Sequence, residues 1–290
     1  MFKNFFKRFI FKFYESNLKR FLRLSSGPYL SGDSIRKQCE HVFDEDKGIN
    51  PRKIKENQSI FVKTDLIEKF FAEVHPKIKF KYFLISHNSD LSISKQEYEL
   101  SDNKVIHWFA QNLEEKMGEN ISILPIGLEN RWRFNNGKIR YFKKLAKKKI
   151  NKSNLILSCF SITTNKDRRK IYELIENNEN IKNISSISPK NYRSLLSQSM
   201  FNICPEGNGL DTHRIWESFA LGSIPIVLIN NFTIQFKDLG IPMLYLESWD
   251  ELNNYDEKFY LNFYQKTSST NDLNKFSTIS FWNDYMESYK

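Results

Sequence analysis

The chain has 290 residues, of which 40% are hydrophobic and 15% aromatic, and its formal net charge is +10. This length allows about two domains of ~150 residues, and the apolar content excludes a largely disordered chain. The three cysteines are widely spaced, which argues against a disulfide framework and for a reducing compartment. The sequence shows no zinc-type Cys/His cluster and no zinc-finger, RRM or KH signature, so we expect no nucleic-acid partner.

The first 14 residues, MFKNFFKRFIFKFY, combine large aromatic side chains with cations. Their apolar residues recur at i, i+3 and i+4, which predicts a basic amphipathic helix within residues 1–24. The cations that lie mostly on its opposite face are Lys3, Lys7, Arg8 and Lys12. Such a helix either lies on an anionic membrane surface or packs its Phe stripe on the protein's own core, and a targeting peptide is the third alternative. The sequence contains no run of ~18 apolar residues, so we expect a cytoplasmic protein, peripheral at the membrane if this helix binds lipid.

Strand-like and helix-like segments alternate after residue 25, which predicts a parallel sheet with helices on its faces. The strand candidates of the first half are residues 59–64, 79–87, 105–110 and 121–127. A helix is predicted at 65–74, with Asp65 as its cap, and a short one at 112–118. The basic, polar stretch 132–152 is interpreted as the connection between two domains, 25–148 and 149–290.

The second half repeats the alternation. Its strand-like segments are residues 154–160, 181–186, 201–204, 224–227 and 242–246. Its predicted helices are residues 166–178, 188–199, 212–221 and 276–290, with another beginning at 248. The fold class predicted for the chain is therefore α/β, with two Rossmann-like domains.

One strand–loop–helix–strand unit, residues 201–228, concentrates polar groups at its loop and on one side of its helix. A glycine-containing loop that leads into a helix presents backbone N–H groups to phosphate. Arg214 and Glu217 are three residues apart and share a helix face. A cation that neutralises phosphate and a carboxylate that accepts hydrogen bonds from ribose suit a nucleoside diphosphate.

The segment PEGNGLDTHRIWESFALGSIPIV resembles the signature of the exostosin-like glycosyltransferases. The matching residues are Pro205, Gly207, Gly209, Asp211, Arg214, Glu217, Gly222 and Pro225. Weaker likeness extends through 85–90, 108–112 and 124–131, so about half of the chain takes part. The resemblance implies a GT-B arrangement of two domains facing a cleft, a nucleotide-sugar donor (a UDP-sugar) and an inverting reaction.

The resemblance places the donor in the second domain, and the residues expected at its site come from the signature and from neighbouring helix starts. These are Gly207, Asn208, Gly209, His213, Arg214, Glu217 and Arg168. His213 lies on the first turn of the helix and either contacts phosphate or faces solvent. Asp211 is interpreted as the helix N-cap, because its carboxylate would repel phosphate. Arg168, at the start of the preceding helix, either approaches the diphosphate or stays solvated.

The first domain is expected to bind a glycan or glycolipid acceptor at the sequence SHNSD, residues 86–90, which directly follows a predicted strand. An inverting transfer needs a base for the acceptor hydroxyl, and His87 or Asp90 is the candidate. Glu129 and Arg131 are expected to line the same cleft. The D-x-D at Asp44–Asp46 is interpreted as a charged loop, and we expect neither a metal nor a cofactor.

The favoured function is transfer of a sugar from a nucleoside-diphosphate donor to an acceptor in surface polysaccharide synthesis. A polysaccharide pyruvyl transferase of the same shape is the rival enzyme. A membrane-surface or nucleic-acid binding module, driven by positive charge, is the non-enzymatic rival.

Overall fold

The computed structural model describes residues 23–133, 135–184 and 187–290. The predicted N-terminal amphipathic helix falls on residues that lie almost entirely outside this part of the chain. Two separate five-stranded sheets form the framework, and all strand pairs in both are parallel. The predicted class, two α/β domains each built on a parallel sheet, is confirmed.

The first sheet takes its strands in chain order, from β1 at one edge to β5 at the other. The strands are β1 (His41–Phe43), β2 (Gln58–Lys63), β3 (Tyr82–His87), β4 (Val105–Ala110) and β5 (Ile121–Ile123). Every residue of β3 is buried, as expected for a central strand covered on both faces. The helices of this half are α2 (Gly32–Gln38), α3 (Ile67–Glu73) and α4 (Lys95–Tyr98), with 3₁₀ turns η1 (Pro51–Lys53), η2 (Thr64–Leu66) and η3 (His75–Lys77).

Two local predictions in the first half are wrong. Asp65 does not cap α3, because it lies inside the 3₁₀ turn η2 and Leu66 occupies the N-cap without a side-chain hydrogen bond. Residues 112–118 form turns and irregular backbone instead of a helix. Asn112 begins that segment in the left-handed conformation, with φ of 53°, and Leu113 forms a bridge to Ile93.

The second sheet has the strand order β10-β9-β8-β6-β7. Its strands are β6 (Asn154–Ser158), β7 (Ile181–Asn183), β8 (Ser199–Ile203), β9 (Ile224–Leu228) and β10 (Leu244–Leu246). Its helices are α6 (Asp167–Ile175), α7 (Pro189–Ser197), α8 (His213–Ala220), α9 (Thr233–Asp238) and α10 (Glu257–Thr270), with 3₁₀ turns η4 (Trp249–Asn253) and η5 (Leu273–Ser277). Since β6 has β7 on one side and β8 on the other, the strand order reverses there. A crevice outside the carboxyl ends of β6 and β8 is the usual ligand position in such a sheet.

The stretch interpreted as a connection contains a helix, α5 (Ile139–Ala146), which packs against α7 of the second half. Phe142 of α5 is buried, and the guanidinium of Arg193 lies 4.8 Å from its ring centroid. Arg193 also donates hydrogen bonds to the carbonyls of Asn135 and Asn136. Ile139, Phe142 and Leu145 recur at helical spacing and pack on the core, so the helical pattern is present in the sequence, and the lysines around it led to its interpretation as a connection.

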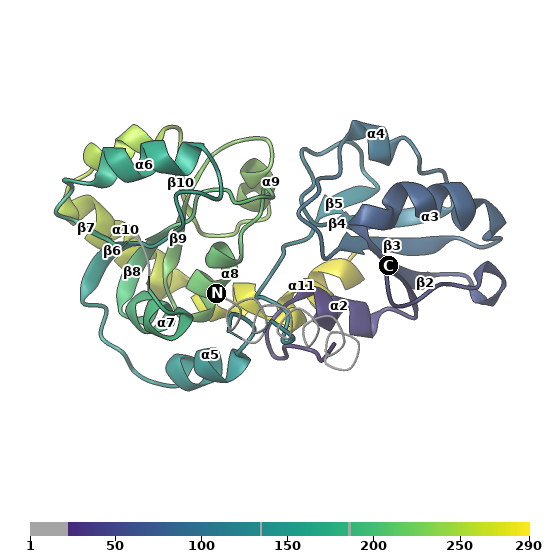
Figure 1. Cartoon of the computed structure of the whole chain (residues 1–290), viewed down its shortest axis with the longest axis horizontal. Helices are drawn as coiled ribbons and strands as arrows, with labels where there is room; N and C mark the ends of the chain where they lie inside the picture. Colours follow the sequence, from purple (N-terminus) through teal and green to yellow (C-terminus); the bar gives the residue numbers. More distant parts are fainter. Residues whose placement is uncertain (1–22, 134, 185–186) are drawn as a thin grey trace, which may run out of the picture.

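The last helix, α11 (Ile279–Glu287), joins the two halves and is seen between them in Figure 1. Trp282 packs edge-on against Trp216 of α8, with ring centroids 5.7 Å apart, and its indole N–H donates to the Phe276 carbonyl. At the far end of the helix, the Tyr289 ring lies 4.0 Å from that of His107 in the first sheet. The C-terminal segment therefore returns to the first domain.

The three cysteines are all free, in agreement with the absence of a disulfide framework. In the part of the chain that is described, no helix has the length and apolar character needed to cross a bilayer.

We expect Trp282→Ala to lower the free energy of unfolding by about 3–5 kcal/mol, because it removes a fully buried aromatic at the junction of the two halves. Denaturant unfolding measures the effect. Phe80→Ala is the control, since Phe80 is 45% exposed and its loss should change little. Equal effects of the two substitutions would contradict a central role for α11.

Candidate functional site

The loop between β8 and α8 lies at the carboxyl ends of the strands, where the strand order reverses. The guanidinium of Arg214 reaches across this point, and its Nε donates to the Cys159 carbonyl after β6 at 2.9 Å. The same guanidinium lies 5.6 Å from the Tyr192 ring centroid. Arg214 is thus held beside the loop and the helix N-terminus by contacts that use only part of its donor capacity.

Glu217 lies one turn further along α8 and is 7% exposed. Burial raises the pKa of its carboxyl, while the positive charges of Arg193 and Arg214 oppose that rise. Within the described residues, no group donates a hydrogen bond to this carboxylate. A buried carboxylate without a donor is costly, and a ligand hydroxyl would satisfy it.

Asp211 connects the two domains and is not the N-cap that the sequence predicted. Thr212 occupies the cap position. One Asp211 oxygen accepts the backbone N–H of Ile126 in the first domain at 2.7 Å, and the other accepts the N–H of Thr212 at 2.7 Å. The indole N–H of Trp216 lies 3.0 Å from both oxygens. Burial raises the pKa of Asp211 to about 6, and these N–H donors act against the rise.

The loop between β8 and α8 packs closely on the first domain at Gly209. A Cβ added to Gly209 would lie 2.7 Å from the amide nitrogen of Asn112 and 2.9 Å from the Asp90 carbonyl oxygen. Asn112 also accepts the backbone N–H of Asp211 at 2.9 Å, and Asn208 approaches the Asp90 carboxylate at 3.4 Å. The glycine is therefore required by domain contact, whereas the sequence had suggested close approach to a ligand.

His213 lies at the same interface. Its Nδ1 is 2.7 Å from the Gly127 carbonyl, and its Nε2 is 3.6 Å from a carboxylate oxygen of Glu129. Burial alone would lower the pKa of His213. The negative charge of Glu129, the Gly127 carbonyl and the carboxylates of Glu217 and Asp211 outweigh it, so the pKa is raised. The prediction that Glu129 faces this site agrees with its position.

The Arg168 side chain hydrogen bonds to the protein's own backbone. Its guanidinium donates to the carbonyls of Glu206, Pro205 and Ser161, at 2.7, 3.0 and 3.3 Å. Burial lowers its pKa to about 10, so it remains a cation at neutral pH. Arg168 shapes the loop between β8 and α8, and neither of the two roles considered from the sequence describes this position. Gly207 lies next to it, with room for a Cβ 3.5 Å from its guanidinium.

A cavity of about 350 Å³ lies between His213 and the strand ends of the first domain. Its lining residues are Gly32, Lys63, Asp65, Asn88, Ser89, Asp90, Leu91, Gln111, Ile126, Glu129, Asn130, Trp132, Arg133 and His213. Most follow β2, β3, β4 or β5, as the crevice rule for parallel strands predicts. We refer to this space as the interdomain cavity. Arg131, also expected to line the cleft, is not among these residues and contacts the Ser25 carbonyl instead.

The two candidate bases, Asp90 and His87, differ in exposure and in how far their polar atoms are already hydrogen bonded. Asp90 is exposed and lines the interdomain cavity. His87 is fully buried, and both of its ring nitrogens are used, at 3.0 Å from the Pro125 carbonyl and 2.7 Å from the Asn88 N–H. Burial lowers the pKa of His87 to about 4. With no ring nitrogen available to an acceptor hydroxyl, His87 instead supports the turn that carries Asp90.

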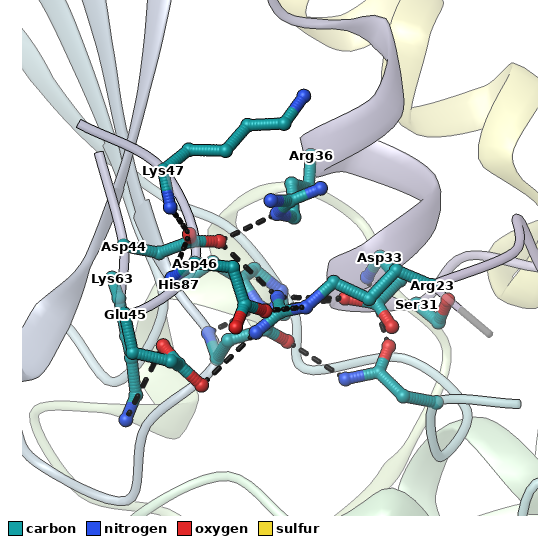
Figure 2. A network of polar contacts seen from close by, with 12 residues as sticks. Arg23, Ser31, Asp33, Arg36, Asp44, Glu45, Asp46, Lys47, Lys63 and His87 are labelled. Atoms are coloured by element: carbon teal, nitrogen blue, oxygen red, sulfur yellow. Dashed lines mark hydrogen bonds and ion pairs between the residues drawn. The ribbon is translucent and has the colours of Figure 1, made fainter. Parts of the chain in front are cut away.

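A polar network that sequence reasoning missed supports this cavity (Figure 2). Arg23 lies within 3.3 Å of Asp33, Asp44, Glu45 and Asp46 carboxylate oxygens. The D-x-D carboxylates are thus held by Arg23, with Arg36 also bonded to Asp44, as the charged-loop interpretation suggested. No cluster of three or more potential metal ligands occurs among the residues described.

The network continues from Arg23 to the cavity wall. Asp33 accepts a hydrogen bond from the Asn88 amide at 3.3 Å, and Asn88 accepts one from Asn130 at 2.9 Å. The backbone N–H of Asp33 in turn donates to Asn130 at 2.8 Å. Asn88 has a φ of 64°, a conformation that asparagine tolerates and that turns the chain directly after β3.

The fold and the site define a two-domain α/β protein with a polar, ligand-sized cavity at the domain interface. Residues 140–282, just under half of the chain, match the family model described as RXYLT1 C-terminal domain. The chain is thereby related to a glycosyltransferase family over the domain that carries α8.

Curated proteins named ribitol-5-phosphate xylosyltransferase 1 also match. The Danio rerio protein is 32% identical over 79 residues, which is 23% of this chain and 18% of that protein. The Homo sapiens protein is 32% identical over 85 residues, which is 24% of this chain and 19% of that protein. The match thus spans less than a fifth of these relatives' length. The exostosin-like resemblance is not tested by these matches and stays a prediction.

Solved structures with similar architecture include the apo structure of OtsA, with a TM-score of 0.48 and 10% identity over 82% of this chain and 74% of that one. A second is "Trehalose-6-phosphate from E. coli bound with UDP-2-fluoro glucose", with a TM-score of 0.47 and 10% identity over 81% and 74% of the two chains.

We expect Glu129→Gln to lower the pKa of His213, because it removes the largest opposing charge. Histidine proton NMR measures the titration, with the signal assigned by His213→Gln. Because the pKa of His213 is raised in the folded state, its protonation stabilises the fold. This contribution is fully present below the unfolded-state pKa of about 6.5, and it is lost as the pH rises through the folded-state pKa. In Glu129→Gln the loss should therefore occur at lower pH. Asp65→Asn, in the same cavity, is the control, and an unchanged His213 titration in Glu129→Gln would contradict the pairing.

Proposed function

We propose that this chain is a glycosyltransferase that moves a sugar from a nucleoside-diphosphate donor to a glycan or glycolipid acceptor, with inversion and without a metal. The observation that carries the proposal is α8. Its first residues place His213 and Arg214 where the strand order reverses, and its buried Glu217 lacks a donor. The match to the RXYLT1 C-terminal domain covers this same segment. The exostosin-like resemblance of residues 205–227 implies the same reaction class.

In this proposal the diphosphate binds at the amino end of α8. The positive end of the helix dipole, Arg214 and His213, whose pKa is raised by Glu129, attract its charge. Glu217 accepts hydrogen bonds from the ribose hydroxyls. The acceptor occupies the interdomain cavity, so its hydroxyl approaches from the first domain.

The chemical step is a displacement at the anomeric carbon. The acceptor oxygen forms a bond to that carbon, the bond from the carbon to the phosphate oxygen breaks, and Asp90 takes the acceptor proton. The nucleoside diphosphate leaves with the bonding electron pair. His213 and Arg214 stabilise the charge that develops on it, which is where a fixed cation is most effective.

A thermal-shift screen with UDP, GDP, CDP and their sugars tests the proposal, because a ligand that binds only the native state raises its apparent stability. The names of the relatives suggest a pentosyl donor and an acceptor with a polyol phosphate, so UDP-xylose and ribitol phosphate belong in the assay. Turnover of a nucleotide sugar separates this function from pyruvyl transfer. Salt-sensitive binding to anionic vesicles or nucleic acid without any nucleotide affinity would favour the non-enzymatic rival.

Arg214→Ala should weaken nucleoside-diphosphate binding by roughly 1.5–3 kcal/mol, the value of a hydrogen bond to a charged group. Calorimetry on the folded variant measures this loss. Arg169→Ala is the matched control, since Arg169 is an exposed arginine of the neighbouring helix α6. Equal nucleotide affinity in the wild type and Arg214→Ala would remove Arg214 from the donor site.

Asp90→Asn should reduce sugar transfer by ~100-fold or more and leave nucleotide affinity intact, because it removes the base and keeps a side chain of the same size beside Asn208. Steady-state rates with the native acceptor provide the measurement. Asp65→Asn, another carboxylate of the interdomain cavity, should retain activity. Near-normal turnover of Asp90→Asn would exclude Asp90 as the base and make Glu129 the next residue to test.

A further inference from the structure

A second cavity, of about 200 Å³, lies within the second domain, among the start of α6, the loop after β8 and the end of β9. Its lining residues are Asn165, Asp167, Arg168, Ile171, Cys204, Pro205, Glu206, Leu210, Ile215, Val227, Leu228, Asn230, Thr233 and Trp249. We refer to it as the β8–β9 cavity. It shares Pro205, Glu206 and Leu210 with the loop that leads to His213 and Arg214, so its occupant would lie beside anything bound at the amino end of α8.

The charges of this cavity exclude a phosphate. Glu206 and Asp167 both line it, and the one cation among the described lining residues is Arg168. The Arg168 guanidinium already donates to three backbone carbonyls. Burial raises the pKa of Glu206, with Asn230 opposing the rise and Asp167 adding to it. A ligand here must donate hydrogen bonds to carboxylates without bringing negative charge of its own.

Glu206 and Asn230 are pre-arranged for such a ligand. The Asn230 amide oxygen accepts the N–H groups of Phe232 and Thr233 at the start of α9, at 3.1 and 2.9 Å. This fixes the amide so that its nitrogen donates to Glu206 Oε1 at 2.9 Å. Across the described residues, nothing donates to the other oxygen of Glu206. That oxygen can accept from a ligand hydroxyl.

The rest of the β8–β9 cavity wall is largely apolar. Ile171, Val227 and Trp249 supply apolar and aromatic surface beside the carboxylate and the amide. A few fixed polar groups on a largely apolar wall are typical of a small-molecule site. A sugar ring presents hydroxyls to the polar groups and C–H faces to the walls, and it carries no charge.

We propose that the β8–β9 cavity binds the sugar of the nucleotide-sugar donor, with Glu206 and Asn230 hydrogen bonding to its hydroxyls. This inference rests on the proposed glycosyltransferase function and extends it. The donor then divides between two environments: its diphosphate contacts the cations of α8, and its sugar contacts the carboxylate side of the same loop. Glu206 acts as a residue that determines sugar specificity.

The test compares the affinity of a nucleoside diphosphate with that of its sugar nucleotide, by calorimetry. The probes are UDP with UDP-xylose and UDP-glucose, and GDP with GDP-mannose. In Glu206→Ala, the dissociation constant of the bound sugar nucleotide should rise about 10-fold or more, as expected for a lost charged hydrogen bond, while that of the matching diphosphate stays within about twofold. Glu206→Gln should show a smaller change in the same direction, because it keeps the size of the side chain.

Glu173→Gln, an exposed carboxylate of α6 outside the cavity, is the matched control and should bind both probes as the wild type does. The unchanged diphosphate affinity shows that each variant is folded. A sugar-nucleotide affinity that Glu206→Ala leaves unchanged would overturn the inference alone. A parallel loss for the diphosphate and its sugar nucleotide would also overturn it, since the cavity would then bind the nucleotide. A wild-type chain that binds none of the probes would overturn the proposed function and the inference together.

Discussion

The buried carboxylate of Asp211 is the interaction on which the site depends. It accepts the Ile126 N–H from the first domain and the Thr212 and Trp216 N–H groups from the second, so it fixes the start of α8 against the strand ends of the other sheet. A carboxylate with this burial is stable only while its donors stay in place, because each missing donor would leave a charge uncompensated. The interface is therefore specified by a few directional bonds as well as by apolar packing.

That constraint explains why the cationic and the acidic groups of the second domain face separate regions. The loop after β8 is closed on one side by Gly209 against Asn112, and on the other by Arg168 bonded to the loop carbonyls. His213 and Arg214 consequently face one region, and Glu206 faces another. An extended ligand with an anionic and a neutral part can satisfy both regions at once, whereas a simple anion satisfies only the first.

The sequence predicted the framework well and the polar contacts poorly, for a physical reason. Strands such as β3 and β4 are continuous apolar runs because both faces of a parallel sheet are covered, and such runs are visible locally. The unit from β8 to β9 was found from its ordered residue types. By contrast, Asp211 and Gly209 take their roles from residues about 90 positions away, such as Asn112 and Ile126, and a local pattern contains no trace of these partners. Arg168 shows the same limit, since its acceptors are backbone carbonyls, which every sequence possesses.

Asp90, the base of the proposed reaction, is held in place by the first domain through the turn that carries it. Asp90 is exposed, and its carboxylate lies 3.4 Å from the Asn208 amide, a long contact, so its position depends on the turn that carries it. That turn is fixed from behind by Asn88, which bonds to Asp33 and Asn130, and Asp33 is held in turn by Arg23. Arg23 also pairs with the carboxylates of the acidic loop 44–46, so this part of the chain is tied to the first-domain wall of the interdomain cavity. Without the Arg23 guanidinium, the carboxylates of this cluster would repel one another. The turn after β3 would then lose the support that directs Asp90 toward the cavity.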